Sequence, residues 1–536
     1  MNPTIDTLFF DLGDVLFTWS PSTQLPSVPP KTLRKILESA TWFEYEKGRI
    51  SEDACYATVA AEFSISPDHV REAFQAARDT LTSRPFMVDL IRQLKPGRKV
   101  YAMSNISAPD WLVLSKKNAD WSIFDDVFTS AAVGERKPNI GFYRHVLGAT
   151  GADPARSVFV DDKLDNVLVA RSFGIHGVVY DTFENVQRSL LNLCLDPIAR
   201  ARSFLYNNRR NHLSYTNTGV TIQENFAQLL ILEATGDPSL VDYTKHDGQF
   251  NFFRGAGELT TAKFPCDADT TSIGLTIAPH VSPITRNRIM DDILQLRNSD
   301  GVIQVYFDSS RPRIDPVVCV NVLTLFHENG RGEELKETFD WVENVLRYGA
   351  YEAGTRYYEP AEAFLFFLSR LLSASTKARQ RLGALFVQRV RERIGLRADA
   401  LALAMRILCV LAVSSLGLSP PIDVTVDVQA LRNMQEIDGG WADGWFYKYG
   451  ASGVLIANRG FTTALGMNAL KGFKEWEEKS SRIVEVPKER IPVVKPEVVH
   501  SQMSAPSVPH GMRRWVEALC FVGVGIAGSY AARGLV

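Results

Sequence analysis

The sequence predicts a multidomain protein in which a Rossmann-like α/β domain with a helical cap precedes an all-α domain. Three observations support this fold class. The chain has 536 residues, more than the roughly 100–200 that one domain usually holds. Residues 1–195 alternate short apolar runs with amphipathic segments, which is typical of parallel strands joined by helices. Residues 205–475 show helical apolar spacing almost throughout.

Four short apolar runs predict the strands of the first domain: Thr7–Phe10, Lys99–Met103, Val158–Val160 and Gly177–Val179. A helical insertion at about residues 20–85 separates the first two runs. Because open α/β sheets bind ligands outside the carboxyl ends of their strands, we expect this insertion to form a cap over a ligand site.

The second domain is predicted to be helical, and strand patterns nearly disappear from it. The expected helices are Asn225–Thr235, Lys336–Tyr348, Ala361–Leu372, Ala378–Ile394 and Ala398–Val413. These segments repeat the apolar spacing of one helical face, so each is expected to bury that face against its neighbours.

The C-terminal end has a different composition. Residues 476–512 are rich in Pro, Lys, Glu, Val and Ser, which predicts an extended linker. Residues 513–536 contain an apolar run from Ala518 to Ala532, shorter than the roughly 20 residues of a spanning helix. A docking helix or a disordered tail is therefore favoured, with membrane contact through the tail as the alternative.

Composition and charge favour small-molecule chemistry. The formal charge of −2 gives no field that would hold nucleic acid, so no nucleic-acid partner is expected. The six cysteines include no C-x-x-C pair, which argues against a disulfide framework and a zinc knuckle. No signal-peptide pattern precedes the first apolar run, so a cytoplasmic location is expected. The sequence leaves open whether the chain forms homo-oligomers.

Polar residues follow three of the predicted strands. Asp11 comes directly after the first run, Ser104-Asn105 after the second, and Asp161-Asp162 after the third. Lys137 lies between the last two groups, in Gly-Glu-Arg-Lys-Pro-Asn. A carboxylate at the end of a strand can attack phosphorus and form an aspartyl-phosphate. In this order, over about 195 residues, the four motifs resemble those of the haloacid dehalogenase (HAD) superfamily.

The HAD resemblance implies a role for each of these residues. Asp11 would be the nucleophile, Ser104 and Asn105 would bind the phosphoryl group, and the Lys137 ammonium would neutralise charge. Oxygen ligands suit Mg²⁺. The implied cofactor is therefore Mg²⁺, and its ligands would be Asp11, Asp162 and the Gly13 carbonyl, with Asp161 close by.

Gly13 departs from the HAD pattern. Most phosphatases of the superfamily carry a second Asp there as general acid and base. The nearest acid, Asp14, is one position further on, and adjacent extended positions point to opposite faces. Two interpretations stay open: a working phosphatase, and a domain that is retained but silent.

Asp267 and Asp269 stand out in the helical half, in Asp-Ala-Asp-Thr-Thr. Protonating an isolated alkene needs a neutral carboxylic acid that is shielded from water. Two like charges close together raise one pKa, which favours the neutral form. The run resembles the D-x-D-T-T motif of class II terpene cyclases. That resemblance implies Asp269 as the general acid and Asp267 as its orienting partner, with Thr270 beside the substrate.

A second element, Gln435-Glu-Ile-Asp-Gly-Gly-Trp441, resembles the Q-x-x-D-G-G-W element of cyclase α/α barrels, where Gln and Trp tie helix ends together. Aromatic faces can stabilise a carbocation, and Trp441 and Tyr306 are expected among them. Basic side chains can hold a diphosphate. The candidates are Arg311, Arg313, Lys448 and Arg459.

Together, the HAD-like and D-x-D-T-T halves resemble the drimane-type sesquiterpene synthases, from about Thr4 to Lys474. The family implies that Asp269 protonates farnesyl diphosphate, that a drimenyl or albicanyl diphosphate forms, and that the phosphatase releases drimenol or albicanol. One alternative keeps the cyclase but has a silent phosphatase and a diphosphate product. A second is a metabolite phosphatase whose helical half binds a partner protein.

Overall fold

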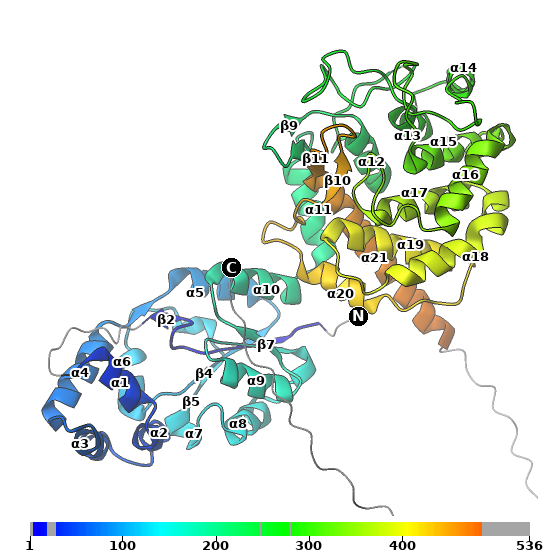
Figure 1. Ribbon diagram of the computed structural model, residues 1–536. Helices are drawn as coiled ribbons and strands as arrows, with labels where there is room; N and C mark the ends of the chain where they lie inside the picture. The colour runs from blue at the N-terminus through cyan, green and yellow to red at the C-terminus, as the bar shows by residue number, and fades with distance from the viewer. Residues whose placement is uncertain (1–3, 19–27, 247, 279, 485–536) are drawn as a thin grey trace, which may run out of the picture. The chain divides into compact units, whose positions relative to one another are not determined.

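The computed structural model describes residues 4–18, 28–246, 248–278 and 280–484 (Figure 1). Its N-terminal part contains a five-stranded parallel sheet in the order β5-β4-β1-β6-β7. The strands are β1 (Thr7–Phe10), β4 (Lys99–Ser104), β5 (Asp126–Thr129), β6 (Ser157–Asp161) and β7 (His176–Val179). The sequence did not predict β5, because this edge strand is only partly buried and has no continuous apolar run.

Both faces of this sheet are covered, which explains the unbroken apolar runs of its central strands. Leu8 and Phe10 join one buried cluster, whereas Phe9 joins the cluster on the opposite face. Helices follow the strands in the usual crossover manner. They are α5 (Pro85–Leu94), α6 (Ala108–Leu114), α7 (Ser130–Val133), α8 (Ile140–Thr150), α9 (Leu164–Ser172) and α10 (Phe183–Cys194).

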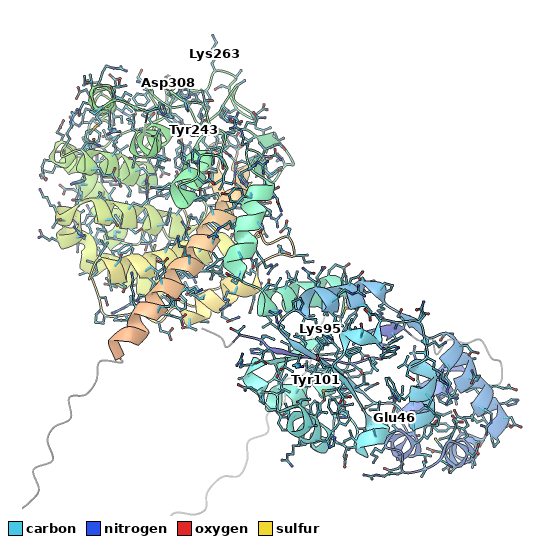
Figure 2. The ribbon with its side chains drawn as sticks, turned by 180° about the vertical axis from the view of Figure 1, so that it is seen from behind. Glu46, Lys95, Tyr101, Tyr243, Lys263 and Asp308 are labelled. Atoms are coloured by element: carbon cyan, nitrogen blue, oxygen red, sulfur yellow. The ribbon has the colours of Figure 1, made fainter. Side chains whose placement is uncertain are left out.

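The predicted insertion forms a four-helix cap with its own core. Its helices are α1 (Pro30–Leu37), α2 (Ala40–Glu46), α3 (Glu52–Phe63) and α4 (Pro67–Asp79). Trp42 stacks on Phe74, and Tyr56 stacks on Phe74 as well, inside this core. Two short strands, β2 (Phe17–Thr18) and β3 (Thr82–Ser83), pair antiparallel at the base of the insertion. Figure 2 marks Glu46 at the end of α2 and Tyr101 on β4.

In the C-terminal part, helices close into a ring. Packing runs from α12 to α13, α15, α17, α19 and α21, and α21 returns to α12, while α11, α16, α18 and α20 pack outside. This is an α/α barrel, as the sequence predicted. The helices are α11 (Pro197–Asn207), α12 (Phe226–Thr235), α13 (Ala268–Ile277), α14 (Pro283–Leu294), α15 (Pro316–Glu328), α16 (Lys336–Arg347), α17 (Ala361–Ala374), α18 (Thr376–Arg393), α19 (Ala400–Ser415), α20 (Thr425–Asn433) and α21 (Arg459–Val484).

A small antiparallel sheet in this part was not expected from the sequence. Its strands are β8 (Ser214–Thr216), β9 (Thr221–Ile222), β10 (Trp445–Lys448) and β11 (Leu455–Asn458). Each strand is too short to show a repeating pattern, and β8 and β11 are far apart in the sequence. The sheet therefore depends on the barrel that brings its strands together.

The C-terminal end of the described chain is helical for longer than expected. Helix α21 continues to Val484, so the first residues of the predicted linker, 476–484, belong to a helix. The rest of the linker and the apolar segment 513–536 lie outside the described residues. Within the described ranges, no helix is both long enough and apolar enough to cross a membrane.

Two candidate active sites

The first site is built at the carboxyl ends of three neighbouring strands. Ser104 and Asp161 are the last residues of β4 and β6, and Asp11 directly follows β1 between them. The Asp11 backbone N–H donates to the Val160 carbonyl at 2.9 Å, which fixes its position beside β6. All three side chains are largely buried. The parallel sheet therefore brings these predicted phosphatase residues together at the carboxyl ends of its three central strands.

A buried lysine joins two of these carboxylates. Lys137 Nζ lies 2.8 Å from Asp11 Oδ1 and 2.7 Å from Asp161 Oδ2, and the lysine is only 1% exposed. Asn105 holds the lysine's backbone: its amide donates to the Lys137 carbonyl at 2.9 Å and accepts from the Lys137 N–H at 2.8 Å. Asn105, which the sequence assigned to substrate binding, thus positions Lys137 in this structure.

The charge balance of this site fits a divalent cation. Carboxylate oxygens of Asp11, Asp161 and Asp162 lie within 4.8 Å of one another. Lys137 is buried between Asp11 and Asp161, and the exposed Lys163 pairs with Asp162 at 2.7 Å, so these two ammonium groups do not balance three carboxylates. Hard oxygen ligands are those that Mg²⁺ prefers. Burial raises the pKa of Asp11 to about 7, although Lys137 acts in the opposite direction. A Cβ built on Gly13, two residues after Asp11, would meet no atom within 4 Å.

The second site begins at the N-terminus of α13. Asp267 is the N-cap residue: its Oδ1 accepts from the Thr270 N–H at 2.6 Å, and its Oδ2 accepts from the Thr270 hydroxyl at 3.0 Å. Such a cap fixes the first helical turn. Asp269 lies within this turn, so its direction is set by the Asp267 cap. The spacing of the Asp-Ala-Asp-Thr motif therefore has a local structural cause.

Asp269 is held by two neutral donors from distant parts of the chain. Asn321, on α15, donates to Oδ1 at 2.7 Å, and the Tyr358 hydroxyl donates to Oδ2 at 2.5 Å. The carboxyl is 8% exposed. Burial raises the pKa of Asp269 to about 8, and Asp267 adds to this rise while Tyr358 and Asn321 oppose it. Asp269 is therefore mainly protonated at neutral pH.

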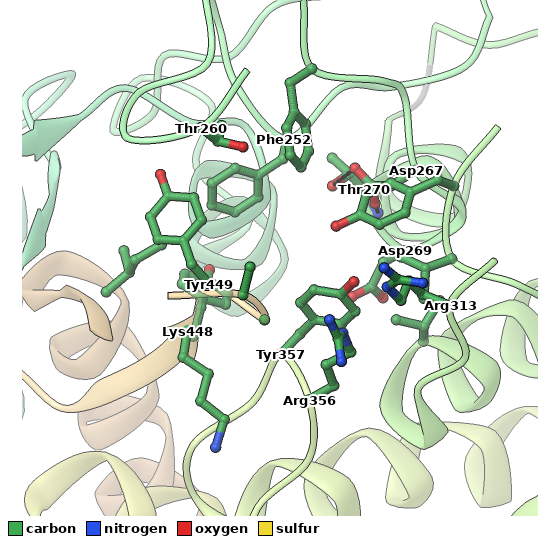
Figure 3. A pocket seen from close by; sticks show the side chains of 18 of the residues that line it. Phe252, Thr260, Asp267, Asp269, Thr270, Arg313, Arg356, Tyr357, Lys448 and Tyr449 are labelled. Atoms are coloured by element: carbon green, nitrogen blue, oxygen red, sulfur yellow. Dashed lines mark hydrogen bonds between the residues drawn. The ribbon is translucent and has the colours of Figure 1, made fainter. Parts of the chain in front are cut away.

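Asp269 opens onto a cavity of about 410 Å³ (Figure 3), within the size range of small-molecule pockets. Its aromatic wall consists of Phe226, Phe252, Phe253, Phe264, Tyr306, Tyr357, Tyr358, Tyr447 and Tyr449. Asp267 and Thr270 line it beside Asp269. A buried neutral acid in an aromatic chamber can protonate an alkene and stabilise the cation that results.

Four basic side chains also line the cavity, and two of them are free of acidic partners. Arg311 pairs with Asp308 at 3.3 Å, and Lys448 pairs with Glu359 at 2.8 Å. In the part of the chain that the structure describes, the other two make no ion pair. These are Arg313 and Arg356. They are the better-placed groups for a diphosphate, and sequence analysis did not single out Arg356 as a basic residue.

Two residues that the sequence assigned to substrate binding lie outside the cavity lining. Trp441 is fully buried, and its indole N–H donates at 2.7 Å to the carbonyl of Leu431, in the last turn of α20. Arg459 forms two 2.8 Å bonds with Asp438. The Q-x-x-D-G-G-W element therefore serves barrel architecture, because its indole is bonded inside the wall and its Asp438 pairs with Arg459 at the surface.

Sequence analysis missed Asn321 and the contact of Tyr358 with the acid. One signal was present for Asn321: it is a lone amide within the otherwise apolar run Val317–Leu323 on α15. A buried polar side chain in such a run needs a partner. The partner is 52 residues away in the sequence, so only the fold identifies it.

Known proteins resemble both parts of the chain. The family model of the sesquiterpene cyclase astC-like C-terminal domain matches residues 198–329, a range that contains Asp267, Asp269 and Asn321. Drimenol cyclase drtB from Aspergillus calidoustus is 44% identical over 87% of this chain and 88% of its own length.

The N-terminal part has its own relatives. Sesquiterpene phosphatase astK from Aspergillus oryzae is 38% identical over 33% of this chain and 91% of its own length. A solved HAD-like family hydrolase from Porphyromonas gingivalis is 22% identical, with a TM-score of 0.32, over 36% of this chain and 100% of its own. The long match to the drimenol cyclase spans both halves of the chain. The chain therefore belongs to the family of drimane-type sesquiterpene synthases, enzymes that join a HAD-like phosphatase domain to a class II terpene cyclase domain.

Proposed function

We propose that this bifunctional enzyme cyclises farnesyl diphosphate to a drimane-type bicyclic diphosphate and then removes the phosphate groups to give the alcohol. The observation that carries the proposal is Asp269: a buried, neutral carboxyl at the wall of an aromatic cavity. The relative named as a drimenol cyclase supports drimenol over albicanol as the alcohol.

Cyclisation begins when the Asp269 O–H bond breaks and a C–H bond forms at the distal alkene. The carboxylate that remains keeps both hydrogen bonds, from Asn321 and Tyr358, and these strengthen once their acceptor is charged. Ring closure moves the positive charge along the prenyl chain between aromatic faces, which attract it without attacking it. Loss of a proton ends the sequence, and the diphosphate remains on the product.

The diphosphate end of the substrate needs a positively charged site. Arg313 and Arg356 line the cavity and form no ion pair in the described ranges, so both guanidinium groups are available. Arginine suits phosphate oxygens because it can donate two parallel hydrogen bonds. These contacts would hold one end of the substrate while the other end meets Asp269.

Dephosphorylation would occur at the first site. Two rounds are needed. The Asp11 carboxylate attacks the terminal phosphorus of the diphosphate, the P–O bond to the departing prenyl monophosphate breaks, and water hydrolyses the aspartyl-phosphate. The same steps on the monophosphate then release the prenyl alcohol. The Lys137 ammonium, 2.8 Å from Asp11, offsets the charge of the two anions that must meet. Mg²⁺ held by Asp11, Asp161 and Asp162 would supply further positive charge at the phosphoryl oxygens.

The test uses farnesyl diphosphate with the wild type, Asp269→Asn and Asp11→Asn. Extracts are analysed by gas chromatography and mass spectrometry, with and without added phosphatase. We expect free bicyclic alcohol from the wild type, no bicyclic product from Asp269→Asn, and bicyclic alcohol from Asp11→Asn only after added phosphatase. Bicyclic product from Asp269→Asn would refute the acid assignment, and wild-type alcohol release by Asp11→Asn would refute the nucleophile assignment.

A further inference from the structure

A line of polar contacts leads from Asp269 through the barrel wall, away from the substrate cavity. Asn321 donates to Asp269 at 2.7 Å, and its amide oxygen accepts from Arg370 Nη1 at 3.4 Å. Arg370, on α17, in turn donates to Glu233 Oε1 on α12, from Nη2 at 2.6 Å and from Nε at 3.1 Å. Four side chains on four helices of the inner ring are thereby connected.

This chain of polar contacts ends at a second pocket, which is smaller than the aromatic cavity. Glu233 and Arg370 line a cavity of about 350 Å³, and it shares no lining residue with the aromatic cavity. Arg370 also lies over the Phe367 ring, 5.7 Å from its centroid. Arg370 therefore lies behind the wall, outside the lining of the aromatic cavity.

The contacts decide which way the Asn321 amide faces. An asparagine amide has a donating end and an accepting end, whereas an arginine can only donate. Arg370 can therefore face only the amide oxygen, which turns the N–H toward Asp269. With the amide reversed, its oxygen would face the Asp269 oxygen and could not stabilise a carboxylate there.

We propose that Arg370, held by Glu233, is a positioning residue for the proton transfer: it fixes the Asn321 amide and polarises it. The inference rests on the proposed role of Asp269 as the acid. When the Asp269 proton moves to the alkene, the carboxylate that forms gains a stronger bond from the polarised N–H. Because this gain arises only as charge develops, it raises kcat and leaves KM nearly unchanged.

The test is a double-mutant cycle on cyclisation, with Arg370→Met, Asn321→Leu and the double variant. We expect Asn321→Leu to lower kcat about 100-fold and Arg370→Met about tenfold, with KM within about twofold of wild type. Because Arg370 acts through Asn321, the double variant should be no slower than Asn321→Leu alone. Arg370→Lys should recover part of the loss, since it keeps a donor and a positive charge.

Arg331→Met is the matched control. Arg331 also pairs with carboxylates, Asp291 and Glu334, and also lies over a phenylalanine ring, Phe326, yet none of these partners contacts Asp269. We expect wild-type kcat from it. Thermal unfolding and phosphatase activity, measured on every variant, report whether the fold is intact. If Arg370→Met does not fold, Glu233→Gln takes its place, with an expected loss of about threefold.

Three results for kcat would overturn the inference: wild-type kcat in Arg370→Met, wild-type kcat in Glu233→Gln when it replaces that variant, or losses that multiply in the double variant. A rise in KM that accounts for the whole loss would do so as well. The Asp269→Asn variant distinguishes failure of the positioning role from failure of the proposed function. If Asp269→Asn is active, the assignment of Asp269 as the acid is wrong. If Asp269→Asn is inactive while Arg370→Met has wild-type kcat, only the positioning role of Arg370 is refuted.

Discussion

Each half of this chain buries a cluster of aspartates, and the two clusters differ in what lies between the carboxyl groups. Asp11 and Asp161 share the Lys137 ammonium, at 2.8 and 2.7 Å. Asp267 and Asp269 are bonded by neutral donors instead, and no ion pair in the described ranges includes either of them. Burial raises the pKa of Asp11 in the first cluster and the pKa of Asp269 in the second.

The comparison shows how one residue type serves two chemistries. A buried cation favours the carboxylate, which is the form that attacks phosphorus. Burial without a cation, together with a second aspartate, favours the carboxylic acid, which is the form that protonates carbon, even though the two neutral donors act in the opposite direction. The predictions below test this difference by changing the surroundings of the carboxyl groups and leaving Asp11 and Asp269 in place.

Removing the cation from the first cluster should have the largest effect. Lys137→Met leaves Asp11 and Asp161 buried without their shared ammonium, so phosphatase turnover should fall about 10³-fold and the protein should lose about 3 kcal/mol of stability. Phosphate release from a prenyl monophosphate and thermal unfolding measure the two losses. Cyclisation, followed with added phosphatase, is the internal control. Near-normal phosphatase turnover would contradict the role given to the lysine.

Removing one neutral donor from the second cluster should have a smaller effect. Tyr358→Phe deletes the hydroxyl that donates to Asp269 at 2.5 Å. A hydrogen bond to a charged group contributes about 1.5–3 kcal/mol, so kcat for cyclisation should fall between about 10- and 100-fold.

Tyr449→Phe is the matched control for the Tyr358 variant. Tyr449 also lines the aromatic cavity, but its hydroxyl donates to the Glu258 carbonyl and not to the acid. Its kcat should stay at the wild-type value. Equal losses in the two variants would mean that the Tyr358 hydroxyl acts on the cavity in general and has no specific effect on Asp269.

The charge on Asp267 should shift the pH profile without abolishing activity. Cyclisation needs protonated Asp269, whose pKa burial raises to about 8, so turnover should be constant at lower pH and fall as pH rises through about 8. Asp267→Asn keeps an N-cap oxygen but removes a charge that raises the pKa of Asp269. The fall should then begin at lower pH. A kcat profile of both proteins decides this, and an unchanged profile would exclude electrostatic coupling between the two aspartates.

The smallest effect is expected at Gly13, where most HAD phosphatases carry an acid. A Cβ built there meets no atom within 4 Å, so we expect Gly13→Asp to fold with close to wild-type stability. It adds a possible proton donor for the leaving group, and phosphatase turnover should rise by less than about tenfold. The rate of prenyl alcohol release in single-turnover experiments measures this change in phosphatase activity. A decrease would mean that the loop after Asp11 must stay uncharged.

The strands β1, β4, β6 and β7 and the acids could be predicted because their signals are local. The apolar run of β1 and the Asp11 that follows it occupy neighbouring positions, and the cap that orients Asp269 comes from Asp267 two residues before it. The cap insertion and five helices of the C-terminal part, α12 and α16 to α19, also show their own periodicity, whereas α13, α15 and α21 of the inner ring were not predicted. Chemistry at these positions follows from residue type and spacing.

The hydrogen-bond partners of Asp269 and the place of Trp441 could not be predicted, because they depend on contacts between distant segments of the chain. Tyr358 reaches Asp269 across 89 residues, and Asn321 reaches it across 52. Trp441 is aromatic like many of the cavity residues, yet it lies outside the cavity lining and its indole N–H donates to the Leu431 carbonyl. By itself the sequence determined which residues can act as acid, nucleophile and cation. Only the tertiary structure decided which carboxyl is paired with an ammonium and which is kept neutral, because pKa depends on burial and on neighbours that the closed ring of helices and the sheet bring together.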